Sequence, residues 1–411
     1  MNLHGLLELL RGRPAFAELA AELRRGGRRR LPLTEGAKPY LVAALAEELD
    51  GPTLVVVGSA TRSRQWAEAL RGWLGQARPV ELFAEADALP YERLPADPIT
   101  RQSRLRALAA LTGDGVPIVV TTARALMDRL ARPEEYAARA VEVRAGDFVD
   151  PAGLAELLLR AGYGPEPLVE EPGQFSRRGG IVDVFPPTEA TAIRIEFFGD
   201  EIESVRSFDP LTQRSKDQLG HCRIGPAAEL FASADQATIE RLAALDVSAL
   251  EESAGDAWQR DMDRLATGQP FATASLYAGE IGRVGLLDYL PTEGIVLLDE
   301  PEGAQAAVEQ IEAQAAELYG ELQHKRQLPA GLRRPFLGWD ELAAEVRRRD
   351  GLDLSWRAEA DGADGAPAGQ DEPALSELLR LVPPYGGRLK VVIDDVVAGL
   401  AAGRRIVILT Q

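Results

Sequence analysis

Short runs of uninterrupted apolar residues, alternating with segments of helical spacing, constrain the fold of this chain more than any other feature. Residues 53–58 (TLVVVG) and 117–121 (PIVVT) are such runs. Helices are expected at 36–50, at 62–74 and from Ala123 onward. Strands without polar alternation are typical of a parallel sheet that is covered on both faces. Residues 1–138 are therefore predicted to form the first part of an α/β domain.

The pattern changes after residue 138. Asp150 is placed to cap a helix that begins at Pro151, because proline is favoured at the first helical position. Three glycine-punctuated strands are expected next, at 174–185, 191–198 and 201–208. The sequence FGDE at 198–201 predicts a tight hairpin turn between the last two strands. Residues 139–225 are therefore predicted to be a small α+β domain inserted into the α/β domain.

Residues 226–355 return to α/β character and are predicted to be the second part of the split domain. A strand at 294–298 precedes a long helix with an apolar stripe. Residues 356–372 are poor in bulky apolar side chains and rich in Gly, Ala and Asp, which predicts a flexible linker. Residues 373–411 are predicted to begin a further α/β domain. A buried-type strand at 406–409 leads us to expect a fragment of a longer polypeptide.

The charge favours a protein partner over nucleic acid. The chain has 64 acidic and 46 basic residues, for a net charge of −18. DNA-binding chains usually present a basic face, so DNA binding by these residues is expected to be weak or absent. A cluster of five arginines between residues 24 and 30 is interpreted first as a solvated face, with DNA or an acidic surface as alternatives. We expect a monomer.

The sequence offers little for catalysis. Cys222 is the one cysteine, which excludes an internal disulfide and indicates a reducing cytoplasm. No apolar stretch is long enough for a membrane span. The histidines at 4, 221 and 324 are scattered, so neither a metal site nor a nucleophile–base pair is predicted. No catalytic residue is assigned.

The most specific stretches lie in the predicted insert. They are EEPGQFSRRGGIVDVFPP at 170–187 and IRIEFFGDEIESVRSFDPLTQRS at 193–215. Together they resemble the UvrB family and the related N-terminal module of transcription-repair coupling factors. Further stretches resemble the coupling factors in the same order: 89–108, 118–130, 132–136, 285–291 and 296–302. The resemblance covers about residues 30–330 and implies a helicase-like fold with a UvrA-binding domain inserted.

The resemblance assigns UvrA binding to Arg178, Arg194 and Phe198, and the adjacent Arg177 is included. Strand alternation places Arg194, Glu196 and Phe198 on one face and the apolar residues 193, 195 and 197 on the other. Arginine and aromatic residues are the common anchors of protein interfaces. Alternation alone leaves open the alternative that the ring of Phe198 packs beneath its hairpin. Glu196 is expected to pair with one of the arginines.

The nucleotide site of a helicase is degenerate in this sequence. A phosphate-binding loop requires GxxxxGK[ST], whereas residues 33–40 read LTEGAKPY. Gly36 and Lys38 remain, but Pro39 removes a backbone donor and Glu35 adds negative charge. Asp299 and Glu300 follow a strand where a helicase holds magnesium; a polar strand end or a helix cap is the simpler interpretation. No cofactor is expected within these residues.

The leading hypothesis is therefore a UvrA-recruiting interaction module rather than an enzyme. The resemblance implies that later domains of the full-length protein bind RNA polymerase and use ATP and magnesium to translocate on DNA. One alternative is a UvrB-like ATPase that loads onto damaged DNA, although the interval 83–111 lacks the aromatic hairpin of UvrB. Another is an autoinhibitory domain that docks on the rest of its own chain.

Overall fold

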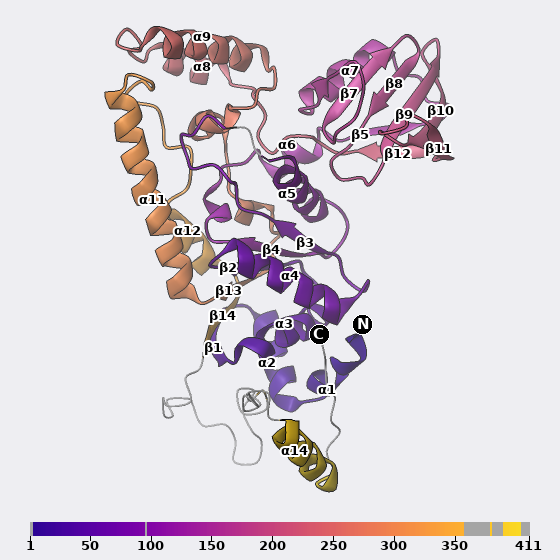
Figure 1. The fold of residues 1–411 in the computed structure, drawn as a ribbon, viewed down its shortest axis with the longest axis vertical. Coiled ribbons are helices and arrows are strands. Elements are labelled where there is room, and N and C mark those ends of the chain that lie inside the picture. Colours follow the sequence, from indigo (N-terminus) through magenta and orange to yellow (C-terminus); the bar gives the residue numbers. More distant parts are fainter. Residues whose placement is uncertain (1–2, 95–96, 357–378, 380–388, 404–411) are drawn as a thin grey trace.

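The computed structural model describes residues 3–94, 97–356, 379 and 389–403 (Figure 1). The linker predicted at 356–372 lies outside these ranges except for Trp356, and the strand predicted at 406–409 lies outside them entirely. Of the domain predicted at 373–411, Leu379 and 389–403 are described, and the latter contain helix α14 (Leu389–Ala401). Within the described ranges, every helix is too short or too polar to cross a lipid bilayer.

A six-stranded parallel sheet forms the body of the protein, which confirms the predicted α/β class. Its strands come from both sides of the insert, so the two separated segments share one sheet. In spatial order they are β1 (Arg28–Leu33), β14 (Gly351–Trp356), β13 (Ile295–Asp299), β2 (Thr53–Val57), β4 (Ile118–Thr122) and β3 (Val80–Phe83). Every residue of β2, β4 and β13 is buried, as continuous apolar strands require.

Side chains of successive residues in β2 enter two different cores. Leu54 and Val56 face one core, and Val55 and Val57 face the other. Helices α2 (Pro14–Arg25), α3 (Lys38–Glu48) and α4 (Ala60–Leu74) cover the second core, with short α1 (Glu8–Arg11) beside them. Helices α5 (Pro98–Leu111), α11 (Pro301–His324) and α12 (Trp339–Arg348) cover the first. Figure 1 shows α11 and α12 on the side of the sheet opposite α3.

The predicted stripe on α11 is confirmed: Val308, Ile311 and Ala315 are buried, and the two leucines that follow pack partly against the same core. The helix predicted from Ala123 is wrong. Only a 3₁₀ turn, Ala125–Met127, forms there. The following backbone instead bridges to distant segments, Asp128 to Phe336 and Leu130 to Val284, so its hydrogen bonds are unavailable for a helix.

The insert is a second six-stranded sheet with α7 (Pro151–Arg160) against one face. Asp150 caps α7 as predicted, accepting from the amides of Ala152 and Gly153. The strands, in spatial order, are β11 (Ser215–Gln218), β10 (Glu201–Phe208), β9 (Ala192–Phe198), β8 (Ile181–Val184), β7 (Gln174–Arg178) and β6 (Gly164–Pro165). A separate pair joins β5 (Val141–Arg144) to β12 (His221–Ile224).

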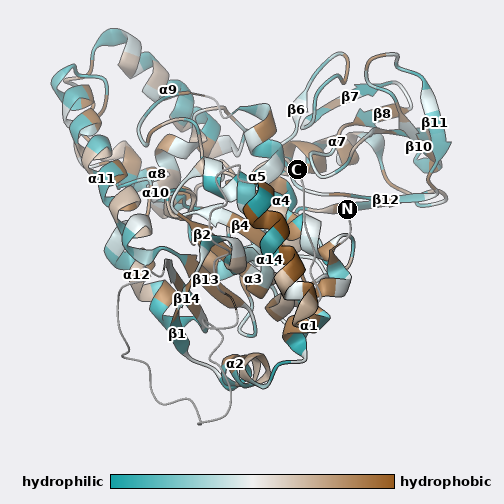
Figure 2. Cartoon of the chain, turned by 60° about the horizontal axis from the view of Figure 1, so that its bottom comes forward, coloured by the Kyte–Doolittle hydropathy of each residue, from teal (hydrophilic) through white to brown (hydrophobic). Residues whose placement is uncertain are grey.

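The segment predicted as one strand at 174–185 is a hairpin of two strands. Gly179 has φ 60°, which supplies the turn. A side chain on Gly180 would meet the carbonyl oxygen of Phe197 at 2.9 Å, so glycine lets the neighbouring strand approach. Helix α6 (Pro133–Ala137) precedes the insert, and α8 (Gln236–Ala243), α9 (Glu252–Thr267) and α10 (Ala278–Ile281) follow it. Figure 2 shows apolar strands β13 and β14 inside the body and hydrophilic β10 and β11 at the margin of the insert.

Candidate functional site

The face of the insert sheet opposite α7 carries three of the four residues assigned to partner binding. Strand pairing sets Asp183 of β8 directly opposite Arg194 of β9, and Ser176 of β7 opposite Asp183. The next row contains Arg178 opposite Ile181. Directly paired residues of antiparallel strands project from the same face, so these side chains share one surface. Arg177 pairs with the core residue Val182 and so projects from the α7 face at the end of β7. We call Arg178, Arg194 and Phe198 the outer-face patch.

Asp183 joins two arginines of the outer-face patch. Its carboxylate is fully buried and accepts from Arg194 through Nε at 2.7 Å and Nη2 at 2.9 Å. It also accepts from Arg178 Nη2 at 2.9 Å. The hydrogen bond to Asp183 raises the pKa of Arg194 above its ordinary value. Both guanidinium groups are therefore held in fixed orientations before any partner arrives.

Phe198 is 80% exposed at the end of β9, so the interpretation that its ring packs beneath the hairpin is wrong. Gly199, with φ 65°, makes the predicted tight turn directly after it. Ile193 and Ile195 are buried as predicted, and Phe197 is half-buried against the same core. Alternation along β9 therefore leaves one aromatic ring facing solvent.

The pairing predicted for Glu196 is also wrong. Its carboxylate accepts from the hydroxyl of Ser204 and lies 3.6 Å from Nε of Arg206, on the neighbouring strand β10. The acid that serves the patch arginines is Asp183, which the sequence reasoning missed. Its signal was an acidic residue within the otherwise apolar strand IVDV, but only the pairing of β8 with β9 shows what it contacts.

The three patch residues and the neighbouring Arg177 differ in how much surface they present. Arg177 is exposed and the side chain of Arg178 is 49% exposed, whereas that of Arg194 is only 16% exposed. Phe208, Phe185 and Val169 form a small core at that end of the face, and the guanidinium of Arg194 lies 4.8 Å from the Phe208 ring centre. Arg178 and Phe198 therefore offer more contact area than Arg194.

The residues interpreted from the sequence as a degenerate nucleotide site contact one another. Lys38 is fully buried, and its ammonium donates to Asp299 at 2.8 Å, Glu300 at 2.6 Å and Glu35 at 2.7 Å. Burial alone lowers the pKa of an ammonium, but these three carboxylates outweigh it and raise the pKa of Lys38. Gly36 lies in the 3₁₀ turn Glu35–Ala37 that precedes α3.

A second cation completes this network. Arg62 of α4 donates to Asp299 and Glu35, and the indole of Trp66 donates to Asp299 at 3.2 Å. The carboxylates of Glu35, Asp299 and Glu300 are near enough to share a metal ion, but Lys38 and Arg62 already bring positive charge to them. Glu300 occupies the N-cap position of α11, but its side chain accepts no hydrogen bond from the first turn of that helix.

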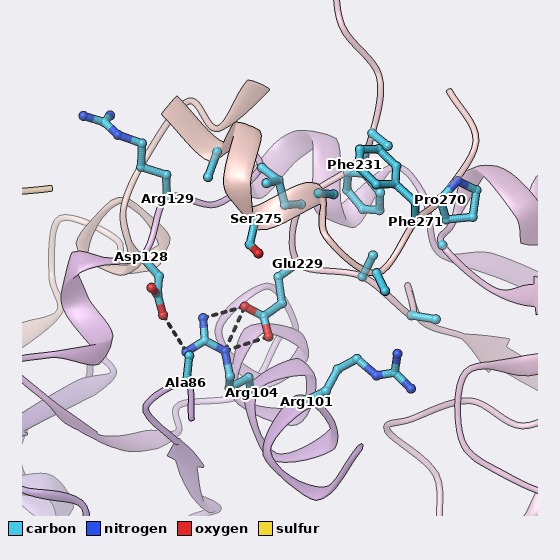
Figure 3. A pocket seen from close by; sticks show the side chains of 18 of the residues that line it. Ala86, Arg101, Arg104, Asp128, Arg129, Glu229, Phe231, Pro270, Phe271 and Ser275 are labelled. Carbon is cyan, nitrogen blue, oxygen red and sulfur yellow. Dashed lines mark hydrogen bonds and ion pairs between the residues drawn. The ribbon is translucent and has the colours of Figure 1, made fainter. Parts of the chain in front are cut away.

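A cavity of about 750 Å³ lies where α5, the insert and the chain leaving the insert meet (Figure 3). Arg104 of α5 crosses one wall and is nearly fully buried. Its guanidinium donates to Glu229 through Nε at 2.7 Å and Nη2 at 2.6 Å, and its Nη1 lies 2.8 Å from Asp128. These ion pairs fix the segment that follows the insert against α5.

The arginine cluster at 24–30 does not present a free basic face. Four of its members have acidic partners: Arg24 with Glu48, Arg28 with Asp353, Arg29 with Glu22, and Arg30 with Glu302. Nε of Arg25 donates to the carbonyl of Ala21. Arg24, Arg25, Arg29 and Arg30 are exposed, in line with the solvated-face interpretation, and the ion pairs of the cluster join β1 and α2 to neighbouring elements.

Residues 141–230 match the family described as the UvrB interaction domain. The chain is 32% identical over 332 residues to the transcription-repair-coupling factor of Myxococcus xanthus and 28% identical over 328 residues to that of Bacillus subtilis. Each alignment covers 77% of this chain and 28% of the relative, so the chain spans little more than a quarter of these proteins. The UvrABC system protein B of Mycobacterium tuberculosis is 27% identical over 367 residues, which cover 77% of this chain and 48% of that protein.

The boundaries of the family match agree closely with the boundaries of the insert. The matched residues run from the first residue of β5 to the segment containing Glu229, and so include the whole insert sheet and the outer-face patch. The chain combines an α/β body with an insert that matches the UvrB interaction domain, and it is similar in sequence to transcription-repair-coupling factors and, at lower identity, to UvrB.

Proposed function

We propose that this chain recruits UvrA through the outer-face patch, as the interaction module of a transcription-repair-coupling factor. The observation that carries the proposal is the placement of Phe198, 80% exposed, on the same sheet face as two arginines fixed by one buried carboxylate. Aromatic and arginine side chains are the residues most enriched among binding hot spots. The UvrB interaction domain match supports the choice of partner.

We propose a different role in binding for each residue of the patch. Phe198 inserts its ring into an apolar hollow of the partner. Arg178 keeps donors free after its bond to Asp183, because a guanidinium has five N–H groups, and it pairs with a partner carboxylate. Arg177 is exposed on the other face at the end of β7 and adds positive charge near the patch, while Arg194 mainly keeps the outer face in its observed geometry.

The wider role is recruitment of excision repair to stalled transcription. In this proposal, the full-length protein displaces stalled RNA polymerase by ATP-driven translocation, with ATP and magnesium bound in motor domains outside these residues. The module described here contributes partner binding without catalysis. The names of the most similar relatives support a role in coupling transcription to repair.

The test is calorimetric titration of the 411-residue chain with UvrA, with Arg194→Ala and Phe198→Ala beside wild type. Removing a central anchor costs about 2 kcal/mol or more, roughly thirtyfold in affinity. We expect Phe198→Ala and Arg194→Ala to bind at least about tenfold more weakly while remaining folded by circular dichroism. Absence of binding by folded wild-type protein would overturn the proposal.

The UvrB-like ATPase is the alternative from another functional class. The buried contacts of Lys38 with three carboxylates disfavour it, because a phosphate would have to displace them. Titration with ATP and magnesium separates the two: micromolar affinity would revive the ATPase, and no heat change supports the interaction module.

Autoinhibition is the other alternative, since the same exposed patch suits a partner within its own chain. It predicts that full-length protein binds UvrA more weakly than this chain does. Equal affinity of the two would exclude it.

A further inference from the structure

A second phenylalanine on the insert is as exposed as Phe198. All eleven phenylalanines of the chain are described, and only Phe148 and Phe198 among them are exposed, at 76% and 80%. Phe148 lies in the connection between β5 and α7, far from Phe198 in sequence. Large apolar side chains that stay in water are more informative than buried ones when they gather in one place.

Backbone pairing brings the two rings to the same surface. Phe148 forms an antiparallel bridge with Glu201, and Glu201 pairs with Phe198 across the hairpin. The bridge is held by two bonds of 2.8 Å, from the amide of Ile202 to Asp147 and from the amide of Val149 to Asp200. Directly opposite residues project from one face, so both rings stand on the outer face with Glu201 between them. Their Cα atoms are about 10 Å apart, two strand spacings.

We infer that Phe148 is a second aromatic anchor of the UvrA-docking surface, extending the outer-face patch across the β9–β10 hairpin. The inference rests on the proposed function. Its occupant is the same partner, because the ring of Phe148 continues the row that begins at Phe198 and lies beside the row of Arg178.

The chemistry defines what the partner surface must contain. Two phenyl rings about 10 Å apart require two apolar hollows, or one groove of that length. The exposed Arg178 requires a carboxylate near one end, while Glu201 and Asp200 between and beside the rings require a cation or a polar rim at the other. A partner that satisfies both ends can dock in only one orientation.

Phe148 contributes little to the stability of the insert, so its substitution tests partner binding without disturbing the fold. Its side chain is mostly in solvent, and the local structure is held by backbone hydrogen bonds that Phe148→Ala retains. Leu157 is the matched control. It is 45% exposed on α7, the helix that covers the opposite face of the same sheet.

The experiment is titration of UvrA with wild-type chain, Phe148→Ala, Phe148→Tyr, Phe198→Ala and Leu157→Ala. We expect Phe148→Ala to weaken binding at least about tenfold, with Phe148→Tyr and Leu157→Ala within about threefold of wild type. Wild-type affinity of Phe148→Ala, alongside weak binding by Phe198→Ala, would overturn this inference and leave the proposed function standing. No binding by wild type would overturn the proposed function itself. Equal weakening by Leu157→Ala would show a non-local effect and count against the inference.

Discussion

Asp183 lies directly opposite Arg194 across the β8–β9 pairing, and its buried carboxylate accepts from Nε of that arginine at 2.7 Å. The same carboxylate accepts from Arg178, so one residue that is inaccessible to a partner sets the orientation of two residues on the binding face. Asp183 therefore acts as a positioning residue in the proposed interface.

Replacing Asp183 should affect both stability and recruitment. Asp183→Ala is expected to lower the free energy of unfolding by about 2 to 4 kcal/mol, because it removes the acceptor of three charge-assisted hydrogen bonds. Affinity for UvrA should fall at least about tenfold although Arg178 and Phe198 remain. Denaturant unfolding and calorimetry measure the two effects. Glu196→Ala, on the same face, should change stability by less than about 1 kcal/mol; unchanged stability and affinity for Asp183→Ala would contradict the positioning role.

Lys38 is expected to contribute to stability, although the sequence resemblance places it at a phosphate-binding loop. Lys38→Met leaves Glu35, Asp299 and Glu300 with only Arg62 and is expected to destabilise the chain by about 3 to 5 kcal/mol. Urea unfolding monitored by circular dichroism measures this. Lys325→Met removes an exposed helical pair with Glu321 and should change stability by less than about 0.5 kcal/mol. Equal effects of the two substitutions would show that the buried network is energetically unimportant.

Arg104 should hold the segment that follows the insert against α5, because its guanidinium offers several N–H donors at once. Arg104→Met leaves Glu229 and Asp128 without their shared cation and is expected to cost about 3 to 5 kcal/mol. Arg104→Lys should restore little of this, because an ammonium cannot match the two-atom contact with Glu229. Thermal unfolding compares both with Arg160→Met, whose side chain is 72% exposed. Full rescue by lysine would contradict the geometric argument.

Cys222 should be unreactive until its strand opens. Burial, with a smaller effect of Glu189, raises the pKa of its thiol to about 12, and the thiolate is the reactive form. Alkylation by iodoacetamide at pH 8 should therefore be slow in native protein and fast in urea. Because the folded thiol holds its proton more tightly, its contribution to stability is complete below about pH 9 and declines as the pH rises towards 12. Rapid alkylation of native protein would show that β12 opens readily.

The sequence by itself determined the elements that depend on local pattern. Apolar runs such as 53–57 predicted the buried strands, since a side chain on each face of a covered sheet must be apolar. Asp150 before Pro151 predicted the start of α7, and the glycine at 199 predicted the hairpin that exposes Phe198. These features follow from neighbours a few residues apart, where propensity and alternation act directly.

Only the tertiary structure decided which charged and aromatic residues meet. The ammonium of Lys38 contacts Asp299, 261 positions away, and Phe148 reaches the row of Phe198 through a bridge to Glu201. Alternation along β9 gave Glu196 and Arg194 the same face, but the strand neighbour supplied Asp183 as the partner instead. Alternation fixes the face of each residue within its own strand, whereas the partner across the sheet depends on strand order and register, which no local pattern in this chain encodes.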